Sequence, residues 1–598
     1  MISLRYLMAS AFLAGSLVGS AQTAPEAFGG DSRLVTKISM RAKIVSLADF
    51  AAQMKKLTGI PMSVASDIAD RKITAIYRDR PAAEVLGAVQ DALFLEWKKV
   101  GDGYKLTLPT VVDHEEQELI QAERDAVRSG VLKSLTRYAQ IAAMSPDEIA
   151  SRIKDLKDRA MAREASRPPN SKSPELQEMQ ALRSVSGQAI CGALSGALPA
   201  VTDSILAGKT VCASTRAEDP VPKIPASYLD HASKMRSGPP TAALVLMRYV
   251  ASEEMVEGES CFVGSSPRMG STITDFFVIR PSMDSPDIQK SKFLARLAKW
   301  QSQADKKVLD KTFLSSVPAT LMPRYFDLGG MAGLTLADHL EYIADHADVP
   351  VIGDAFRVYC SGKQFRGEAT IRSYIQGLMS SNHMEGSLSE PPVGFVSSTN
   401  GWLFVRHRSF WRRQLTEAPE AVLKPIEDAA QTKGVPTSVD YGRFAAALDY
   451  DQAMAITNNG INMAFRFNPF PLQHAYSSLR LWATLSDAQM AAAQNGGFKL
   501  SELSPAQAKL LIDGWAEKMW RGQVPVTLWA SFLSPRGLID TNPTLNYRSD
   551  EFKMEIPPAS ELPPGADPPA SLQVHVQFTY VVRPGVMFAD DYVVSGGK

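Results

Sequence analysis

The sequence predicts a multidomain α+β protein, with two small two-layer βαββαβ-type modules, helical segments between and after them, and a C-terminal β hairpin or small sheet. The first observation behind this prediction is an internal repeat, since the pattern from Ser46 to Val89 recurs from Thr335 to Leu378 at a constant offset without a gap. The second is that apolar residues after Pro109 follow mostly the helical period. The third is an alternation of apolar and polar residues near the C-terminus, which is typical of a half-buried strand.

Residues 1–21 have the three parts of a secretory signal peptide. Arg5 supplies a positive charge, Leu7–Val18 is apolar, and Gly19–Ala21 offers small residues for cleavage. The apolar stretch is shorter than the ~20 residues that a transmembrane helix needs. We therefore expect cleavage near Ala21, a soluble periplasmic or otherwise secreted product, and no stable membrane span after the signal is removed. A buried N-terminal helix is the alternative interpretation.

The charge balance argues against a nucleic-acid partner. Lys plus Arg and Asp plus Glu each number 64, so the formal net charge is zero. A neutral chain produces no long-range field that would attract polyanions, and we expect no binding to nucleic acid.

The chain has four cysteines, which allow three complete disulfide pairings that sequence alone does not distinguish. Export would permit disulfides, and Cys191 with Cys212 would close the shortest loop, so this is the favoured pair. Four buried thiols are the alternative. No two cysteines have the CxxC spacing of a structural zinc site.

The first module is predicted over residues 34–109. Its first strand precedes Ser46, which is a good N-cap for the helix that begins at Leu47, with Asp49 favourable in the first turn. Gly59 ends this helix and Pro61 prevents its continuation.

The rest of the first module follows from similar signals. Met62–Val64 and Ile73–Tyr77 are predicted strands, and Pro81 opens a second helix. The helix presents one apolar face, formed by Val85, Leu86, Val89 and Leu93. Trp97–Val100 and Tyr104–Leu108 then form a hairpin around a Gly-Asp-Gly turn.

These residues resemble the secretin and TonB short N-terminal domain. The resemblance rests on Ser46, Leu47 and Phe50, the Leu57-Thr58-Gly59-Ile60 stop, the helix opened by Pro81, and Gly103-Tyr104. In that family the domain lies in the periplasm, in front of secretins or TonB-dependent receptors, and makes protein–protein contacts. The resemblance implies the same fold and a contact function here. It covers about an eighth of the chain, and the β-barrel or secretin core of those proteins is not indicated after Pro109.

A second, more degenerate copy is predicted over residues 326–415. Thr335 caps a helix over Leu336–His346, and Tyr374, Ile375 and Leu378 belong to the second helix. An inserted loop is expected over Glu385–Asn400, before a strand that begins at Gly401. The alternative is a chance alignment of two amphipathic helices.

The remaining regions are assigned by their periodicity and composition. A helical segment is expected over 110–163, a Pro- and Ser-rich linker over 164–175, and a mixed α/β region over 176–325. A helical region over 416–522 precedes a C-terminal β region over 523–598. In the last region Leu572–Val582 alternates as a strand, with Val526–Phe532 and Leu545–Ile556 as pairing candidates and Pro557–Pro569 as a loop.

No catalytic pattern emerges from the chain. The Gly264–Gly270 stretch lacks the Lys-Ser/Thr of a phosphate-binding loop, and neither a Gly-x-Ser-x-Gly elbow nor a His-Glu-x-x-His helix occurs. His339 and His346 lie two turns apart on one helix, a spacing that is typical of a solvated face more often than of a metal site. We expect no cofactor and no metal, and catalytic residues stay unknown.

Two surfaces are candidates for contact with a partner. One is an open strand edge at Ile73, Ala75 and Tyr77, where an added strand could pair by main-chain hydrogen bonds. The other is a basic and aromatic patch, which includes Arg406, Arg408 and Trp411.

These surfaces lead to one favoured function and two alternatives. We expect an exported cell-envelope protein that acts as an interaction or scaffold module and binds another envelope protein. One alternative is an envelope enzyme of the hydrolase class with an unrecognised site. The other is a protein that binds cell-wall glycan through the patch over Arg406–Arg413.

Overall fold

The computed structural model describes residues 28, 30–164, 174–217, 219, 221–233, 241–250, 255–263, 272–279, 285–315, 334–354, 356, 359–360, 367–381, 393–407, 409–457, 467–511, 544–553, 572–583 and 586–596. The chain divides into two compact units. The smaller unit comprises Met1–Gly30, Ser129–Arg248 and Val256–Pro281, and the larger one comprises Asp31–Arg128, Tyr249–Met255 and Ser282–Lys598. The architecture is mixed helix and strand, which confirms the predicted α+β multidomain class.

The first module follows the predicted order of elements. A short 3-10 helix, η1, precedes it, and its elements are β1 (Lys37–Ser46), α2 (Leu47–Thr58), β2 (Met62–Val64), β3 (Lys72–Pro81), α3 (Ala82–Leu93), β4 (Glu96–Val100) and β5 (Gly103–Thr107). The Ser46 hydroxyl accepts a hydrogen bond from the Asp49 N–H at 3.0 Å, and Gly59 ends α2 in the left-handed conformation. Strands β2 and β5 pair in parallel, and β4 and β5 pair antiparallel.

The second module repeats this order. Its elements are β11 (Leu334–Thr335), α13 (Leu336–Ala347), β12 (Val351–Gly353), β13 (Tyr359–Cys360), β14 (Glu368–Thr370), α14 (Ile371–Ser381), β15 (Val393–Thr399) and β16 (Trp402–His407). Strand β12 pairs with β16 in parallel, and β15 pairs with β16 antiparallel, as β2, β5 and β4 do in the first module. One expectation was wrong, since residues 393–399 of the expected insertion form strand β15, the counterpart of β4.

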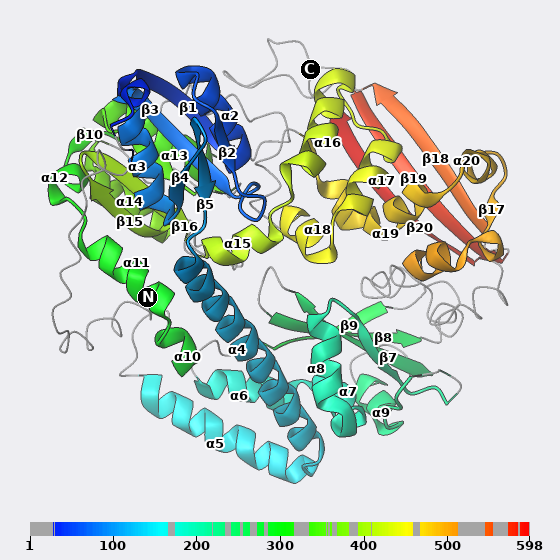
Figure 1. Ribbon diagram of the computed structural model, residues 1–598. Helices are drawn as coiled ribbons and strands as arrows, with labels where there is room; N and C mark the ends of the chain where they lie inside the picture. Colours follow the sequence, from blue (N-terminus) through cyan, green and yellow to red (C-terminus); the bar gives the residue numbers. More distant parts are fainter. Residues whose placement is uncertain are drawn as a thin grey trace. The chain divides into compact units, whose positions relative to one another are not determined.

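The two modules lie side by side (Figure 1) and share one five-stranded sheet, in the order β1-β3-β12-β16-β15. Helix α13 of the second module packs on β1 and β3 of the first, while helix α3 of the first module packs on β12 and β16 of the second. Helices α13 and α3 cover opposite faces of the sheet. Successive side chains of a strand point to opposite faces, and in β16 Leu403 belongs to the core beneath α13 while the adjacent Trp402 contacts α3. Each module therefore covers strands of the other.

Flanking elements complete the shared core of the larger unit. Strand β10 (Thr312–Leu314) pairs with β14, and helices α10 (Pro286–Gln289), α11 (Lys292–Ser302) and α12 (Lys306–Leu309) precede it. The Asp305 N–H donates to the Ser398 carbonyl at 2.9 Å, so the α11–α12 connection covers part of the outer edge of β15.

The smaller unit contains a four-stranded sheet in the order β6-β7-β8-β9. These strands are β6 (Val211–Ser214), β7 (Ala242–Val250), β8 (Met255–Val263) and β9 (Thr272–Ile279). The helices are α5 (Pro146–Glu164), α6 (Pro174–Arg183), α7 (Val185–Ala193), α8 (Leu198–Leu206) and α9 (Ser227–Ser233), with a 3-10 turn, η2 (Ser195–Ala197), between α7 and α8. The long helix α4 (Thr110–Ala142) contributes residues to both units.

The C-terminal part of the larger unit packs helices against an antiparallel sheet in the order β17-β18-β19-β20. The helices are α15 (Phe410–Thr416), α16 (Glu420–Lys433), α17 (Ser438–Ala447), α18 (Tyr450–Thr457), α19 (Phe470–Thr484) and α20 (Asp487–Gln494). The strands are β17 (Phe498–Lys499), β18 (Thr544–Lys553), β19 (Leu572–Arg583) and β20 (Val586–Gly596), with the 3-10 turn η7 (Leu500–Glu502) after β17. The Trp482 ring stacks on Tyr547 with ring centroids 4.2 Å apart, so the helices bury one sheet face.

Several expectations lie outside the described residues: the signal peptide over 1–21, most of the linker over 164–175, the strand Val526–Phe532 and the loop Pro557–Pro569. In the part of the chain that the structure does describe, no single helix is long and apolar enough to cross a membrane. One bent pair, Val185–Ala193 with Ser195–Leu206, passes that test together across a 60° bend.

Candidate interaction site

The strand edge that was expected to be open is occupied within the chain. Strand β3 pairs antiparallel with β12 of the second module, with Thr74, Ala75 and Ile76 opposite Gly353, Ile352 and Val351. Ile73, Ala75 and Tyr77 are all buried. The expectation of an exposed edge at these residues was therefore wrong, because all three side chains are buried and β12 pairs with the middle of β3 at Thr74–Ile76.

Trp402 joins the two modules on the α3 side of the sheet. Its side chain is only 1% exposed, its ring centroid lies 5.6 Å from that of Tyr77, and its Nε1–H donates to Glu84 Oε1 at 2.6 Å. The ring contact thus joins β16 to β3, and the charge-assisted hydrogen bond holds α3 against β16.

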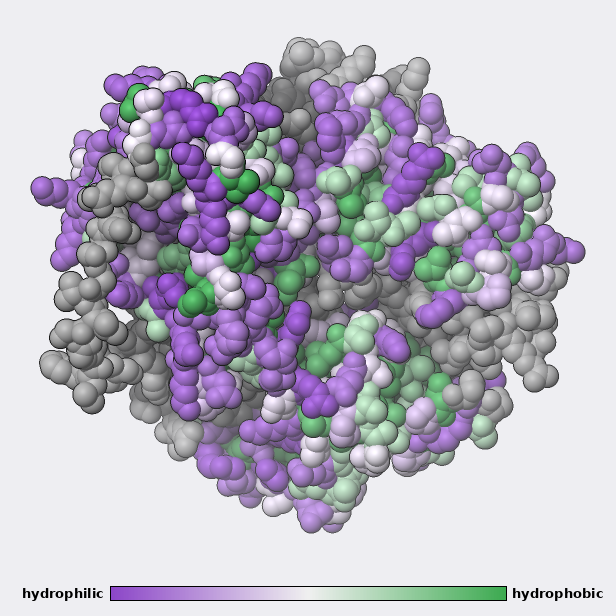
Figure 2. Space-filling model, in the orientation of Figure 1, coloured by the Kyte–Doolittle hydropathy of each residue, from purple (hydrophilic) through white to green (hydrophobic). Residues whose placement is uncertain are grey.

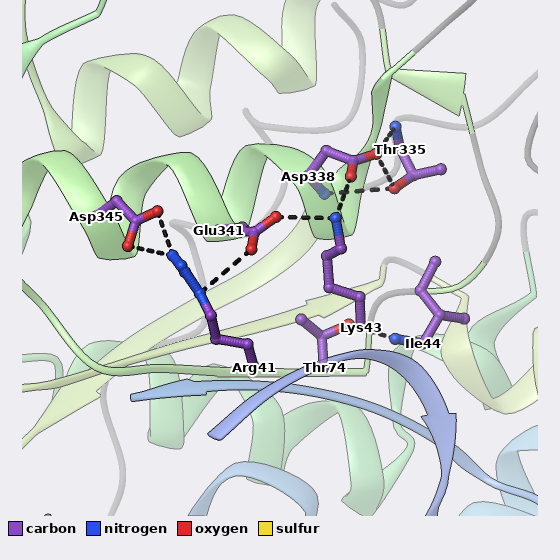
Figure 3. A network of polar contacts seen from close by, with 8 residues as sticks. All are labelled: Arg41, Lys43, Ile44, Thr74, Thr335, Asp338, Glu341 and Asp345. Carbon is purple, nitrogen blue, oxygen red and sulfur yellow. Dashed lines mark hydrogen bonds and ion pairs between the residues drawn. The ribbon is translucent and has the colours of Figure 1, made fainter. Parts of the chain in front are cut away.

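Charged residues join the modules on the opposite face of the sheet, as Figure 3 shows. Lys43 Nζ on β1 lies 2.8 Å from Asp338 Oδ1 and 2.8 Å from Glu341 Oε2 on α13. Arg41 forms a bidentate pair with Asp345, and its Nε lies 3.5 Å from Glu341 Oε1. We call these five residues the seam clamp.

The network of the seam clamp keeps its members charged. Burial by itself lowers the pKa of Lys43, but hydrogen bonds to Asp338 and Glu341 outweigh burial, and the pKa is raised. Burial by itself raises the pKa of Asp338, but hydrogen bonds from Lys43 and Thr335 outweigh it, and that pKa is lowered. Thr335 and Asp338 also form the capping box at the start of α13, so the clamp and the helix cap share one carboxylate.

A backbone irregularity in β1 directs Ile44 toward the second module. Ile44 has a φ of 53°, a left-handed conformation that is strained for a β-branched residue, and it lies within a register shift between Ala42 and Val45. Its N–H donates to Thr74 Oγ1 at 3.1 Å, while its side chain packs against the core of the second module. The strained bulge therefore serves the contact between the modules.

A cavity of about 340 Å³ lies beside the clamp, where α13 ends over β1 and β3. Arg78 and Arg80 of β3 line it together with Asp345 and Asp348. The apolar part of the lining comes from Met40, Ile76, Tyr77, Ala344, Val349 and Pro350. We call it the seam cavity. Figure 2 shows hydrophilic residues predominating, with hydrophobic ones interspersed, on the visible face of the paired modules.

The basic and aromatic patch expected near Arg406 is not a surface. Arg406 is buried, its Nε lies 3.1 Å from Asp354 Oδ2, and its guanidinium lies 3.5 Å from the centroid of the Phe410 ring. Trp411 is also buried and donates through Nε1 to Glu123 Oε2 at 2.8 Å. Arg408 lies outside the described residues.

Arg406 belongs to a buried group of ion pairs that connects the modules with helices α4 and α16. Arg71 Nη2 lies 2.9 Å from Glu116 Oε2 on α4, and Lys72 Nζ lies 2.6 Å from Glu420 Oε2 on α16. Burial raises the pKa of Asp354 to about 6, against the opposing effect of Arg406. Sequence reasoning missed this group, because its members come from five separate places in the sequence: β3, α4, the end of β12, β16 and α16.

The residues of the seam clamp form a recognisable charge pattern in the sequence, although it did not enter the predictions above. Arg41 and Lys43 are two positions apart in a strand and share a face, and Asp338, Glu341 and Asp345 occupy positions i, i+3 and i+7 of one helix. A basic strand face and an acidic helix face of this kind predict a contact between the two elements.

The remaining candidates from the sequence are two histidines and two cysteines. His339 is buried, with Nδ1 2.7 Å from the Tyr374 hydroxyl, so the solvated face expected for this residue was wrong, and His346 stacks on Tyr342. Among the described residues no group of three or more His, Cys, Asp or Glu is arranged to hold a metal ion. Cys191 and Cys212 are free thiols, so the favoured disulfide is not formed, and burial raises the pKa of both to about 12.

Comparison with known proteins gives no relative. No protein-family model, no curated protein and no solved structure matches the chain.

Proposed function

We propose that this chain is an exported cell-envelope protein whose paired modules, similar to the secretin and TonB short N-terminal domain, form one contact unit for another envelope protein. The observation that carries the proposal is the interlocked pair itself. The same order of elements occurs twice, and the copies join by strand pairing between β3 and β12 and by mutual helix covering.

The pairing supports a contact role for a physical reason. The β3 edge of the first module takes up a strand by main-chain hydrogen bonds, and it takes that strand from the second module. This leaves the outer faces, loops and seam cavity of the pair for a partner. The glycan-binding alternative loses its surface, because Arg406 and Trp411 are buried.

Site-specific photo-crosslinking in cells tests the proposal. A photoreactive residue replaces one exposed side chain at a time: Val100 at the β4–β5 turn, Arg372 on α14, and Arg78 at the seam cavity. Arg548 on β18, also exposed, is the matched control. We expect a discrete adduct with one envelope protein from at least one module position and none from Arg548.

The same cells also test the predicted location of the protein. We expect the protein in the envelope fraction with a new N-terminus near Ala21. An intact N-terminus in the cytoplasmic fraction, or the absence of adducts from all three module positions, would contradict the proposal. Turnover of a substrate by the purified chain would favour the hydrolase alternative.

A further inference from the structure

The strand β3 continues beyond the point where its second neighbour stops. Its pairing with β12 ends where Ile76 lies opposite Val351, the first residue of β12. Pro350, the residue before Val351, has no N–H and cannot extend the pairing as a donor. Beyond this point, in the part of the sheet that the structure describes, β3 runs on through Tyr77–Pro81 with only β1 as a partner. The seam cavity lies against this singly paired end.

The lining of the seam cavity combines two kinds of charge with an apolar part. Arg78 and Arg80 come from β3, whereas Asp345 and Asp348 come from the end of α13. Ile76 and Val349 are buried and supply apolar surface. The volume of about 340 Å³ lies within the range of roughly 300–1,000 Å³ that is typical of sites for small ligands.

The charged side chains of the seam cavity differ in whether they already form ion pairs within the protein. Arg41 and Asp345 neutralise each other within the seam clamp, and Arg80 shares a half-buried ion pair of 3.2 Å with Glu84 on α3. Arg78 and the Asp348 side chain are exposed and have no ion pair among the described residues. A ligand with one negative and one positive group satisfies both of them.

We propose that the seam cavity binds an extended peptide segment of the partner, with an acidic side chain at Arg78 and a basic side chain at Asp348. The main chain of the segment lies along the singly paired end of β3, and a guanidinium suits a carboxylate because it donates two parallel hydrogen bonds. The apolar lining takes the side chain between the two charges. This inference rests on the proposed function and specifies the contact that it requires.

Fluorescence polarisation with labelled peptides and the full chain tests the inference. The probes are three short peptides of β-forming residues that differ only in two positions: one glutamate and one lysine, two glutamates, or two lysines. We expect the mixed-charge peptide to bind most tightly. Arg78→Glu should weaken it about tenfold, as loss of a charge-assisted hydrogen bond predicts, and shift the preference toward the two-lysine peptide.

Asp348→Lys should shift the preference the other way, toward the two-glutamate peptide. Arg548→Glu changes another exposed arginine, on β18, and should leave all three affinities unchanged, while thermal unfolding shows that each variant is folded. Equal binding of the three peptides, or an unchanged preference in both seam variants, would overturn the inference. If adducts from Val100 or Arg372 persist in that case, the proposed function stands and only the site is wrong.

Discussion

At the scale of single residues, charge positions helix α13 on strand β1. Lys43 lies on β1 of the first module and forms ion pairs with two carboxylates on α13 of the second module. Replacing it by methionine keeps most of the stem but removes the ammonium group, and leaves Asp338 buried without this partner. We expect Lys43→Met to lower the free energy of unfolding by about 1 kcal/mol, measured by urea denaturation.

Lys98→Met on β4 is the matched control, because Lys98 pairs with Glu96 on the exposed surface of the same module. We expect a change within about 0.5 kcal/mol for this variant. An equal loss in both variants would show that the clamp contributes no more than an ordinary surface pair.

The pH dependence of the Lys43→Met effect follows from the two shifted groups. The pKa of Asp338 is lowered below its usual value of 3.8, so its contribution is present above pH 3.8 and is lost as the pH falls through the folded value. The pKa of Lys43 is raised above 10.5, so its contribution persists until the pH rises through that higher value. The stability difference between wild type and variant should stay constant near neutrality and shrink in acid below 3.8. A difference that shrank near neutrality would point to other groups.

Gly103 shows how one missing side chain fixes a strand register. A Cβ at this position would lie 2.2 Å from the Pro61 carbonyl oxygen, which accepts the Tyr104 N–H at 2.9 Å. Backbone cannot yield as a flexible side chain can, so we expect Gly103→Ala to cost about 2 kcal/mol or more. Gly196→Ala, where a Cβ meets nothing within 4 Å, should change stability little. Similar melting temperatures for the two variants would contradict this.

At the scale of elements, local signals predicted both ends of α2 and the start of α3. The cap at Ser46, the stop at Gly59 and the apolar face with Val85 and Leu93 all occur as expected, since each depends on neighbouring residues. The neighbour of β3 was not predicted, because the sequence does not state which strand lies beside another.

The sequence of β3 nevertheless carried a usable signal. Lys72–Tyr77 is buried at every position, and four of its six residues, Ile73, Ala75, Ile76 and Tyr77, are apolar. Such a run is typical of an inner strand covered on both faces, whereas an edge strand with one wet face alternates. Applied to β3, this criterion would have favoured an inner position for Thr74–Ile76, the part of the strand that pairs with β12.

The interlocked packing makes a prediction for Trp402. Trp402→Ala leaves a cavity between α3 and β16 and removes the hydrogen bond to Glu84, so we expect a loss of about 3–5 kcal/mol. Trp402→Phe keeps the contact with Tyr77 and should cost about 1–2 kcal/mol. Hydrogen exchange should report the loss at β3 as well as at β16. Faster exchange in the second module alone would mean that the modules unfold independently.

At the scale of the whole molecule, ion pairs connect regions that the sequence presents as separate. Arg71 and Lys72 are adjacent at the start of β3, yet one reaches Glu116 on α4 and the other reaches Glu420 on α16. Composition and periodicity divided the sequence into modules and helical segments. Composition and periodicity carry no information on which charged residues form ion pairs across several hundred residues of sequence. These ion pairs were therefore found only in the three-dimensional structure.

Lys72 and Glu420 differ in burial, and this asymmetry gives a sharp prediction. The Lys72 side chain is 1% exposed, whereas that of Glu420 is 27% exposed. Glu420→Ala removes this partner of a buried ammonium, which should cost about 3–5 kcal/mol, because an uncompensated buried charge is strongly unfavourable. Lys72→Met leaves a carboxylate that water still reaches and fills the same space with an apolar chain, so it should cost clearly less.

The double variant Lys72→Met with Glu420→Ala then decides between a pairwise interaction and two independent effects. If the cost of Glu420→Ala arises from the stranded Lys72, the double variant should be more stable than Glu420→Ala alone, because no buried charge remains. Additive losses would instead show that Glu420 stabilises α16 through its place in the first helical turn. In that case the pair would not join the first module to the C-terminal helices. The coupling between them would have to come from Arg406, which lies over the rings of Phe94 and Phe410, and from the apolar contacts of α15.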